Sequence, residues 1–85
     1  MKGYNMETTN IISNTFRRNL PESCCVWITD KEGIYSVELD KTDVSFTDFL
    51  CIISDLYETF GSRQCSFEEY KLNMIFTINA NNSAQ

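Results

Sequence analysis

The four cysteines of this 85-residue chain are the residues whose chemistry most directly suggests a function. Cys24 and Cys25 are adjacent, so in a strand they point to opposite faces and cannot share one bridge toward the core. The sequence contains no Cys-x-x-Cys pair and no histidine, which argues against a tetrahedral zinc site. We therefore expect reduced, mostly buried thiols, with Cys51 and Cys65 as the other two, in an intracellular protein that binds no metal.

Groups for catalysis are equally sparse. Without a histidine, a serine or cysteine nucleophile lacks its usual base, and the three glycines stand too far apart for a phosphate-binding loop. Asp40 and Asp43 flank a loop and could form a carboxylate pair, but no apolar pocket is implied around them, so a solvated turn is the better interpretation. Cys51 has no neighbouring cation to activate it. The sequence predicts no catalytic residue, no cofactor and no enzymatic activity.

Length and composition are typical of one small globular domain. Charged residues make up 22% and hydrophobic residues 42% of the chain, as in folded proteins. The formal net charge of -5 argues against direct binding of nucleic acid, and Arg17-Arg18 is too small a basic footprint. We expect a single domain over 1–85 with flexible ends at about 1–6 and 80–85, without a signal peptide and without insertion into a membrane.

Two segments have helical signatures. Over Glu7–Asn19 an apolar face recurs at helical spacing, and Pro21 ends the segment because the residue before a proline avoids helical geometry. The second segment runs from Phe46 to Phe60, with Ser45 as its N-cap and Gly61 as its C-terminal stop. The broad apolar face expected on this helix consists of Phe46, Phe49, Leu50, Ile53, Leu56, Tyr57 and Phe60.

Three strands are expected in the rest of the chain. Apolar residues begin a strand over Ser23–Asp30, and Asp30 to Gly33 fits a type I turn followed by a left-handed glycine. The strand returns over Ile34–Leu39. Strict alternation of apolar and polar residues predicts a long third strand over Glu69–Asn79.

These elements predict an α+β fold, a small antiparallel sheet made of a central hairpin and a long third strand. The order is helix, strand, strand, helix, strand. Because the five residues at 24–28 are all apolar, both faces of the hairpin need cover. We expect the long helix on one face, and the N-terminal helix or a partner on the other.

The order of these elements also resembles that of a known family. The shared features are a helix that ends in Leu-Pro, an apolar strand and an Asp-x-x-Gly turn. The matching residues are Phe16, Leu20, Pro21, Val26, Ile28, Asp30 and Gly33. The chain resembles the roadblock/dynein light chain family, nearest to its Ragulator-like (LAMTOR) members. It departs from that family, whose domains usually have five strands and a further C-terminal helix.

The resemblance implies a non-enzymatic subunit that pairs through an edge strand into one continuous sheet. The partner would be another roadblock-type subunit or a second copy of the chain, and the pair would scaffold signalling by small GTPases. A Ragulator-like member would be cytoplasmic and would work at the lysosomal or vacuolar surface, recruited by a separate lipidated subunit.

The third strand is the predicted pairing edge. A three-stranded sheet leaves edges open, and a long apolar strand at an edge invites a partner strand. The residues expected to bind the partner are Tyr70, Leu72, Asn73, Met74, Ile75, Phe76, Thr77 and Ile78.

The polar side of the second helix supports an alternative function. Asp48, Asp55 and Glu58 lie on it, and Glu68 and Glu69 add two further carboxylates nearby. A small phage-type inhibitor, anti-defence or anti-CRISPR-like, uses such charges to mimic phosphates or to block a basic groove of a nucleic-acid-handling complex. A net charge of -5 is modest for that role, and a simply solvated face is the better interpretation of the helix residues.

Overall fold

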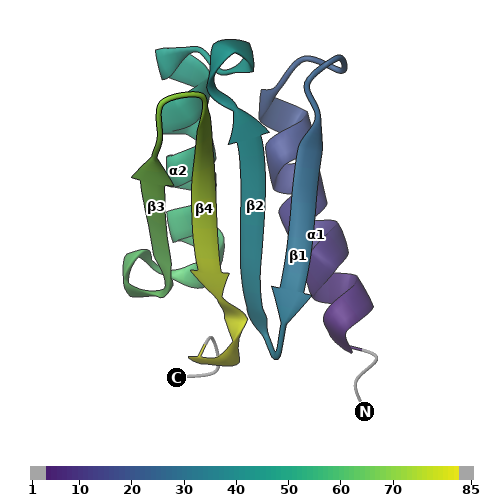
Figure 1. The fold of residues 1–85 in the computed structure, drawn as a ribbon. Helices are drawn as coiled ribbons and strands as arrows, with labels where there is room; N and C mark the ends of the chain where they lie inside the picture. Colours follow the sequence, from purple (N-terminus) through teal and green to yellow (C-terminus); the bar gives the residue numbers. More distant parts are fainter. Residues whose placement is uncertain (1–3, 83–85) are drawn as a thin grey trace.

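A computed structural model describes residues 4–82 as two helices packed on one face of a four-stranded antiparallel sheet (Figure 1). The elements are α1 (Tyr4–Asn19), β1 (Val26–Lys31), β2 (Ile34–Asp40), α2 (Phe46–Phe60), β3 (Cys65–Glu69) and β4 (Asn73–Asn79). Short 3₁₀ turns occupy Lys41–Asp43, Ser62–Gln64 and Ala80–Asn82. The predicted α+β class is confirmed. The flexible ends expected at about 1–6 and 80–85 fall partly within α1 and the last 3₁₀ turn and partly outside the described residues.

The sheet has one strand more than the sequence analysis predicted. Its order is β1-β2-β4-β3, with every neighbouring pair antiparallel. The single strand expected over Glu69–Asn79 is wrong, because the chain turns at Lys71 and Leu72, where the Tyr70 amide donates to the Asn73 carbonyl at 2.8 Å. The missed strand is β3, whose five residues include only two apolar side chains and therefore lack a clear period.

One face of the sheet makes the core together with both helices. Alternate residues of β2 and β4 point to this face, as predicted, and the strand pairing aligns them in rows. The buried residues from the sheet are Tyr35, Val37, Leu39, Met74, Phe76 and Ile78, and those from the helices are Ile12, Phe16, Ile52 and Leu56. Each such side chain, when fully buried, stabilises the fold by roughly 1.5–3 kcal/mol before the entropy of folding is subtracted.

The opposite face of the sheet is not covered by either helix, which corrects the expected arrangement. Figure 1 shows α1 behind β1 and α2 behind β3 and β4, so both helices lie on the same side. In the apolar run at 24–28, Val26 and Ile28 face the core, while Trp27 is 57% exposed on the uncovered face. Cys24 reaches the core from the loop ahead of β1, whereas Cys25 is exposed. The run therefore needs cover on one face only.

The β1–β2 turn is tighter than expected. Pairing continues to Lys31 and Ile34, which leaves only Glu32 and Gly33 to turn the chain. Both have positive φ, 56° and 86°, the requirement of a type I′ turn, whose twist matches that of the strands. The Asp30 side chain accepts a hydrogen bond from the Gly33 amide at 3.1 Å, which explains the Asp-x-x-Gly spacing.

Helix α2 begins and ends where the sequence predicted, but it is rotated relative to the expected apolar face. The Ser45 hydroxyl accepts from the Asp48 amide at 3.0 Å, and Gly61 ends the helix with a φ of 94°. Ile52, which was not expected in the core, is fully buried beside Leu56. Several residues of the predicted face are only half-buried or exposed, and they define the surface described next.

Candidate partner-binding surfaces

The predicted pairing strand lies in the interior of the sheet. β4 is hydrogen-bonded to β2 on one side and to β3 on the other, with Phe76 opposite both Val37 and Phe67. Its backbone therefore has no free side for a partner strand, and the prediction that residues Asn73–Ile78 form an association edge is wrong. Tyr70 and Leu72 lie in the β3–β4 turn.

The two edges that are open belong to β1 and β3, and they differ in what surrounds them. Just ahead of β1, Arg17 of α1 donates to the Cys24 carbonyl at 2.7 Å. Beyond the outer side of β3, the described part of the chain places no strand or helix (Figure 1). Phe67 in the middle of β3 is 40% exposed.

A line of apolar side chains runs along the flank of α2 next to β3. Phe46 is 74% exposed, Leu50 49% and Tyr57 41%, and Ile53 between them is half-buried. Their spacings of four, three and four residues place them in one row on the helix. We call Phe46, Leu50, Ile53 and Tyr57 the α2 stripe. Asp55, which contacts α1, lies about half a helical turn away, so the stripe is on the flank that faces away from α1.

Aromatic rings in contact with one another connect this flank with the core. Phe67 lies 5.9 Å from the buried ring of Phe76 and 4.7 Å from Phe49, and Phe49 lies 6.4 Å from Phe46 (centroid distances). A cleft of about 240 Å³ opens among these rings. Lys41 and Glu69 also line this cleft, paired at 2.6 Å.

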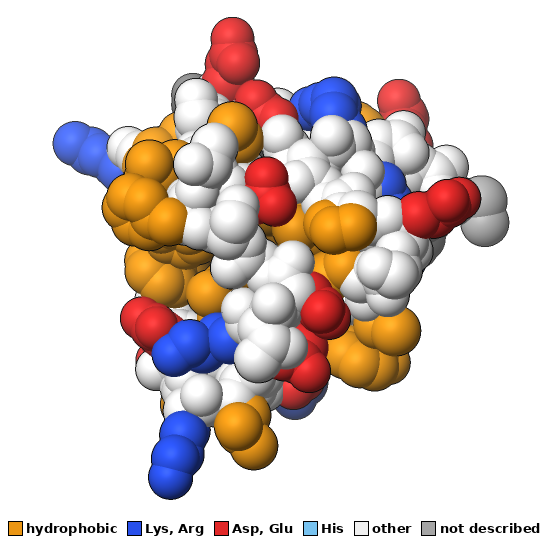
Figure 2. Space-filling view, turned by 90° about the horizontal axis from the view of Figure 1, so that it is seen from above, with side chains coloured by type: hydrophobic (Ala, Val, Ile, Leu, Met, Phe, Trp, Pro, Cys, Tyr) orange, Lys and Arg blue, Asp and Glu red, His pale blue; other side chains and the backbone are white. Residues whose placement is uncertain are grey.

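Seen from the end of the molecule at which α2 begins, hydrophobic side chains gather on the α2 and β3 side (Figure 2). Basic and acidic side chains border this group in the same view. Apolar surface gathered at one place, with a polar border, is typical of protein-binding sites.

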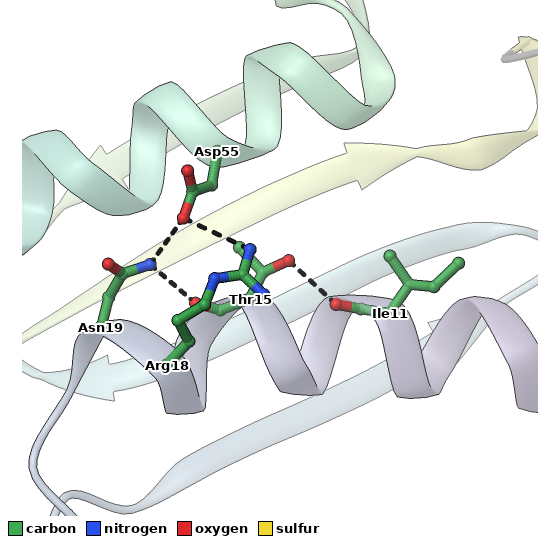
Figure 3. A network of polar contacts seen from close by, with 5 residues as sticks. All are labelled: Ile11, Thr15, Arg18, Asn19 and Asp55. Carbon is green, nitrogen blue, oxygen red and sulfur yellow. Dashed lines mark hydrogen bonds and ion pairs between the residues drawn. The ribbon is translucent and has the colours of Figure 1, made fainter.

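The acidic face predicted on α2 is partly used inside the protein. Asp55 is turned toward α1, where its carboxylate accepts from Asn19 at 2.9 Å and pairs with Arg18 at 3.4 Å (Figure 3). The Asn19 amide also donates to the Thr15 carbonyl at 2.8 Å, and Thr15 donates to the Ile11 carbonyl at 2.9 Å. The contacts of Asp55 join the two helices, while the other two bonds lie within α1.

The other predicted acidic residues do not gather at one place either. Glu69 is paired with Lys41, and Glu68 accepts from the Tyr70 hydroxyl at 2.6 Å, which raises the pKa of that tyrosine. Within the part of the chain that the structure describes, the carboxylates of Asp48 and Glu58 are the two of the predicted set that make no hydrogen bond or ion pair. The predicted acidic face is thus divided among several local contacts.

The chemically reactive groups form no site in the described residues. All four cysteines are free, and Cys25 and Cys51 are exposed, so the expectation of mostly buried thiols holds only for the other two. Burial raises the pKa of both Cys24 and Cys65. Among residues 4–82, no group of three or more metal-ligating side chains occurs.

The proposed carboxylate pair has a structural explanation. The Asp40 carboxylate accepts from the amide of Thr42 at 3.0 Å and from its hydroxyl at 2.8 Å, and these bonds lower the pKa of Asp40. Asp40 thus caps the 3₁₀ turn that leads into α2.

Comparison with known proteins adds no relative: no protein-family model matches the chain, and no curated protein matches it. The roadblock resemblance therefore stays a prediction. Within the described residues, neither helix has the length and apolar character needed to cross a bilayer.

Proposed function

We propose that the protein is a non-enzymatic interaction subunit that pairs with a protein partner along the flank formed by β3 and the α2 stripe. The observation that carries this proposal is that two features, each able to bind a partner, lie at the same place on the surface. An open strand edge and a row of exposed apolar side chains lie next to each other, linked by the contact of Phe49 with Phe67.

Each feature alone is weak. A strand edge supplies backbone hydrogen bonds but little specificity, and exposed apolar residues scattered over a surface are normal. Together they match the way proteins add a partner strand to a sheet while apolar side chains bury against it. The β1 edge lacks this combination, because its Trp27 lies on the uncovered face of the sheet and the neighbouring loop carbonyl is bonded to Arg17.

A narrower role follows from the roadblock resemblance, in which a paired subunit scaffolds small GTPase signalling. The support for it is the sequence likeness at Asp30 and Gly33 together with an open sheet edge. It predicts that a GTPase, or another roadblock-type subunit, copurifies with the native protein.

The acidic-inhibitor alternative has less support. Of its predicted residues, Asp48 and Glu58 are the two whose carboxylates have no partner among residues 4–82. That alternative predicts binding that collapses between low and high salt, because exposed charges are screened beyond about 10 Å at 0.1 M. The apolar flank predicts binding that salt barely changes.

The test compares two leucines in affinity purification from the native source. Leu50→Asp places a charge in the α2 stripe, where Leu50 is 49% exposed, whereas Leu72→Asp places the same charge on a still more exposed leucine of the β3–β4 turn, 73% exposed. We expect the proteins captured by the wild-type bait to be lost with Leu50→Asp and kept with Leu72→Asp. Equal capture by both variants would refute the proposed surface.

A further inference from the structure

We propose that a hollow on the uncovered face of the sheet binds an arginine side chain of a partner protein. The indole ring of Trp27 and the side chain of Leu72 give this hollow apolar walls. Glu38 and Asp40 line it as well and bring two carboxylates to it. The hollow lies on β1, β2 and the start of β4, so the inference goes beyond the flank of the proposed function and does not depend on it.

Strand pairing brings these residues together. Trp27 of β1 lies directly opposite Glu38 of β2, and Asp40 follows two residues later. Because residues 35, 37 and 39 point into the core, Glu38 and Asp40 lie on the uncovered face, which is toward the viewer in Figure 1. On the other side of β2, Asn73 lies opposite Asp40, and Leu72 precedes it. The hollow, about 360 Å³ in volume, therefore has carboxylates between an indole ring and a leucine.

Each of the two carboxylates uses only one oxygen atom inside the protein. The Asn73 side-chain amide donates to Oε2 of Glu38. The amide and the hydroxyl of Thr42 both donate to Oδ1 of Asp40. Among residues 4–82, the second oxygen of each carboxylate has no partner. The internal bonds thus hold both side chains in place and leave one acceptor on each for a ligand.

The chain does not neutralise the charge of the hollow. In the part of the chain that the structure describes, neither Glu38 nor Asp40 forms an ion pair. Lys41 follows Asp40 in the sequence, but its ammonium group is paired with Glu69. Two carboxylates therefore remain for a cation from outside, and a formal net charge of -5 attracts a basic partner.

An indole ring beside two carboxylates fits arginine better than lysine. The planar guanidinium stacks on an aromatic face and presents its N–H donors in one plane, so it can lie on the ring and still bond to carboxylates. Trp27 is 57% exposed, and tryptophan gives the strongest cation–π contacts. The methylene stem of the arginine packs on Leu72. The ammonium of lysine is a compact and strongly hydrated charge, which gains less from a ring face.

The surroundings of the hollow favour an arginine in a polypeptide over the free amino acid. Free arginine carries an α-carboxylate, which the two carboxylates of the hollow repel. A row of hydroxyl groups also crosses all four strands next to the hollow, each residue opposite the next: Thr29, Ser36, Thr77 and Ser66. Hydroxyls both donate and accept hydrogen bonds, so this row suits the peptide groups of a chain that lies across the sheet.

The first test uses the fluorescence of Trp27, which is the only tryptophan of the chain. The probe is the blocked peptide acetyl-Gly-Gly-Arg-Gly-Gly-amide, titrated into the full-length chain. Matched peptides carry lysine, or the uncharged analogue citrulline, in place of the arginine. We expect a saturable change with arginine, binding about fivefold weaker with lysine and at least about tenfold weaker with citrulline. No response to the arginine peptide, or equal affinity for either matched peptide, would overturn the proposal.

The second test removes one charge at a time. Glu38→Gln keeps the size of the side chain and should weaken binding of the arginine peptide by about tenfold. Glu58→Gln removes the same charge from α2 and should change the affinity by less than about twofold, because a distant exposed charge is screened. Circular dichroism checks that both variants remain folded. Equal weakening by the two variants would show that the peptide senses only the net charge, and the hollow would be refuted.

The third test removes one exposed ring at a time, with binding followed by the backbone amide signals of β2 in nuclear magnetic resonance. Trp27→Ala should weaken the arginine peptide by about fivefold or more, because the cation–π contact is lost. Phe46→Ala removes a ring of the α2 stripe and should leave the affinity unchanged. Binding that survives Trp27→Ala at full strength would exclude the indole ring as the binding surface.

The outcomes separate this inference from the proposed function. Leu50→Asp should leave the affinity for the peptide unchanged. Leu72→Asp keeps the indole ring and adds a third carboxylate, so it should not weaken the peptide either. A chain that fails to bind the arginine peptide refutes the hollow and leaves the flank proposal intact. Peptide binding that is lost with Leu50→Asp would assign the arginine to the flank and overturn the hollow.

Discussion

The two flanks of the molecule are built in opposite ways. On the α1 flank, Ile12 and Phe16 are fully buried, and polar side chains close the contact between the helices, with Asp55 held by Arg18 and Asn19. On the β3 flank the aromatic rings begin in the core and continue outward, until Phe46 is largely in solvent.

This difference separates stability from binding. The α1 flank buries Ile12 and Phe16, leaves Ile11 40% exposed, and joins the helices through Asp55, so it contributes mainly to folding. The β3 flank exposes apolar surface. A chain of 85 residues buries only about 60–65% of its surface on folding, so its stability is marginal. Substitutions on the first flank should lower stability, and those on the second should change association.

The largest effect is expected from comparing one phenylalanine on each flank. Phe16→Ala leaves a cavity in the core and should lower the free energy of unfolding by about 3–5 kcal/mol. Phe46→Ala removes an exposed ring and should change it by less than about 0.5 kcal/mol. Urea unfolding, followed by circular dichroism, measures both. If Phe16→Ala does not fold, Phe16→Leu gives a smaller loss of the same sign. Equal losses at the two positions would mean that the flanks do not differ.

A smaller effect should separate two carboxylates of α2. Asp55→Ala leaves Arg18 and Asn19 without their acceptor and should cost about 0.5–1.5 kcal/mol. Glu58→Ala lies one turn farther on the exposed side and should stay within about 0.5 kcal/mol of wild type. Thermal unfolding of both variants in the same buffer provides the measurement. If Glu58→Ala were more destabilising than Asp55→Ala, the polar contacts of Asp55 with α1 would not be the ones that stabilise the helix pair.

The smallest effect concerns the reactivity of the thiols, which is a matter of rates. Iodoacetamide near neutral pH should label the exposed Cys25 and Cys51 first, as followed by mass spectrometry. Cys24 and Cys65 should react slowly, because burial limits access and raises the pKa of each thiol, while the thiolate is the nucleophile. Their rates should therefore keep rising to higher pH than those of unburied thiols. Cys65, the less buried of the two, should react before Cys24. Labelling of Cys24 as fast as Cys25 would show that the α1 flank opens readily.

The sequence by itself determined the local structure that depends on a few neighbouring residues. The Ser45 hydroxyl caps the start of α2, and Gly61 ends the helix because glycine adopts positive φ freely. Both effects are confined to one helical turn. Alternation along β2 and β4 identified the residues that share the core face, and the order of the predicted helices and strands identified an α+β fold. The sequence placed the turn at Asp30 to Gly33, one residue longer at its start than the structure has it, because its length and type depend on how far the strands pair.

Tertiary structure alone decided the arrangement that gives the candidate site its form. The short segment Cys65–Glu69 becomes a strand because β4 offers it a backbone to pair with, and this pairing moves the open edge from β4 to β3. Periodicity shows which residues of α2 share a side, but not which side faces the sheet. Because α1 packs on the same face of the sheet, α2 turns Ile52 and Leu56 into the core and leaves Phe46, Leu50 and Tyr57 at the surface. A local sequence pattern cannot predict which side of α2 faces the core, since this depends on where a helix distant in the sequence lies.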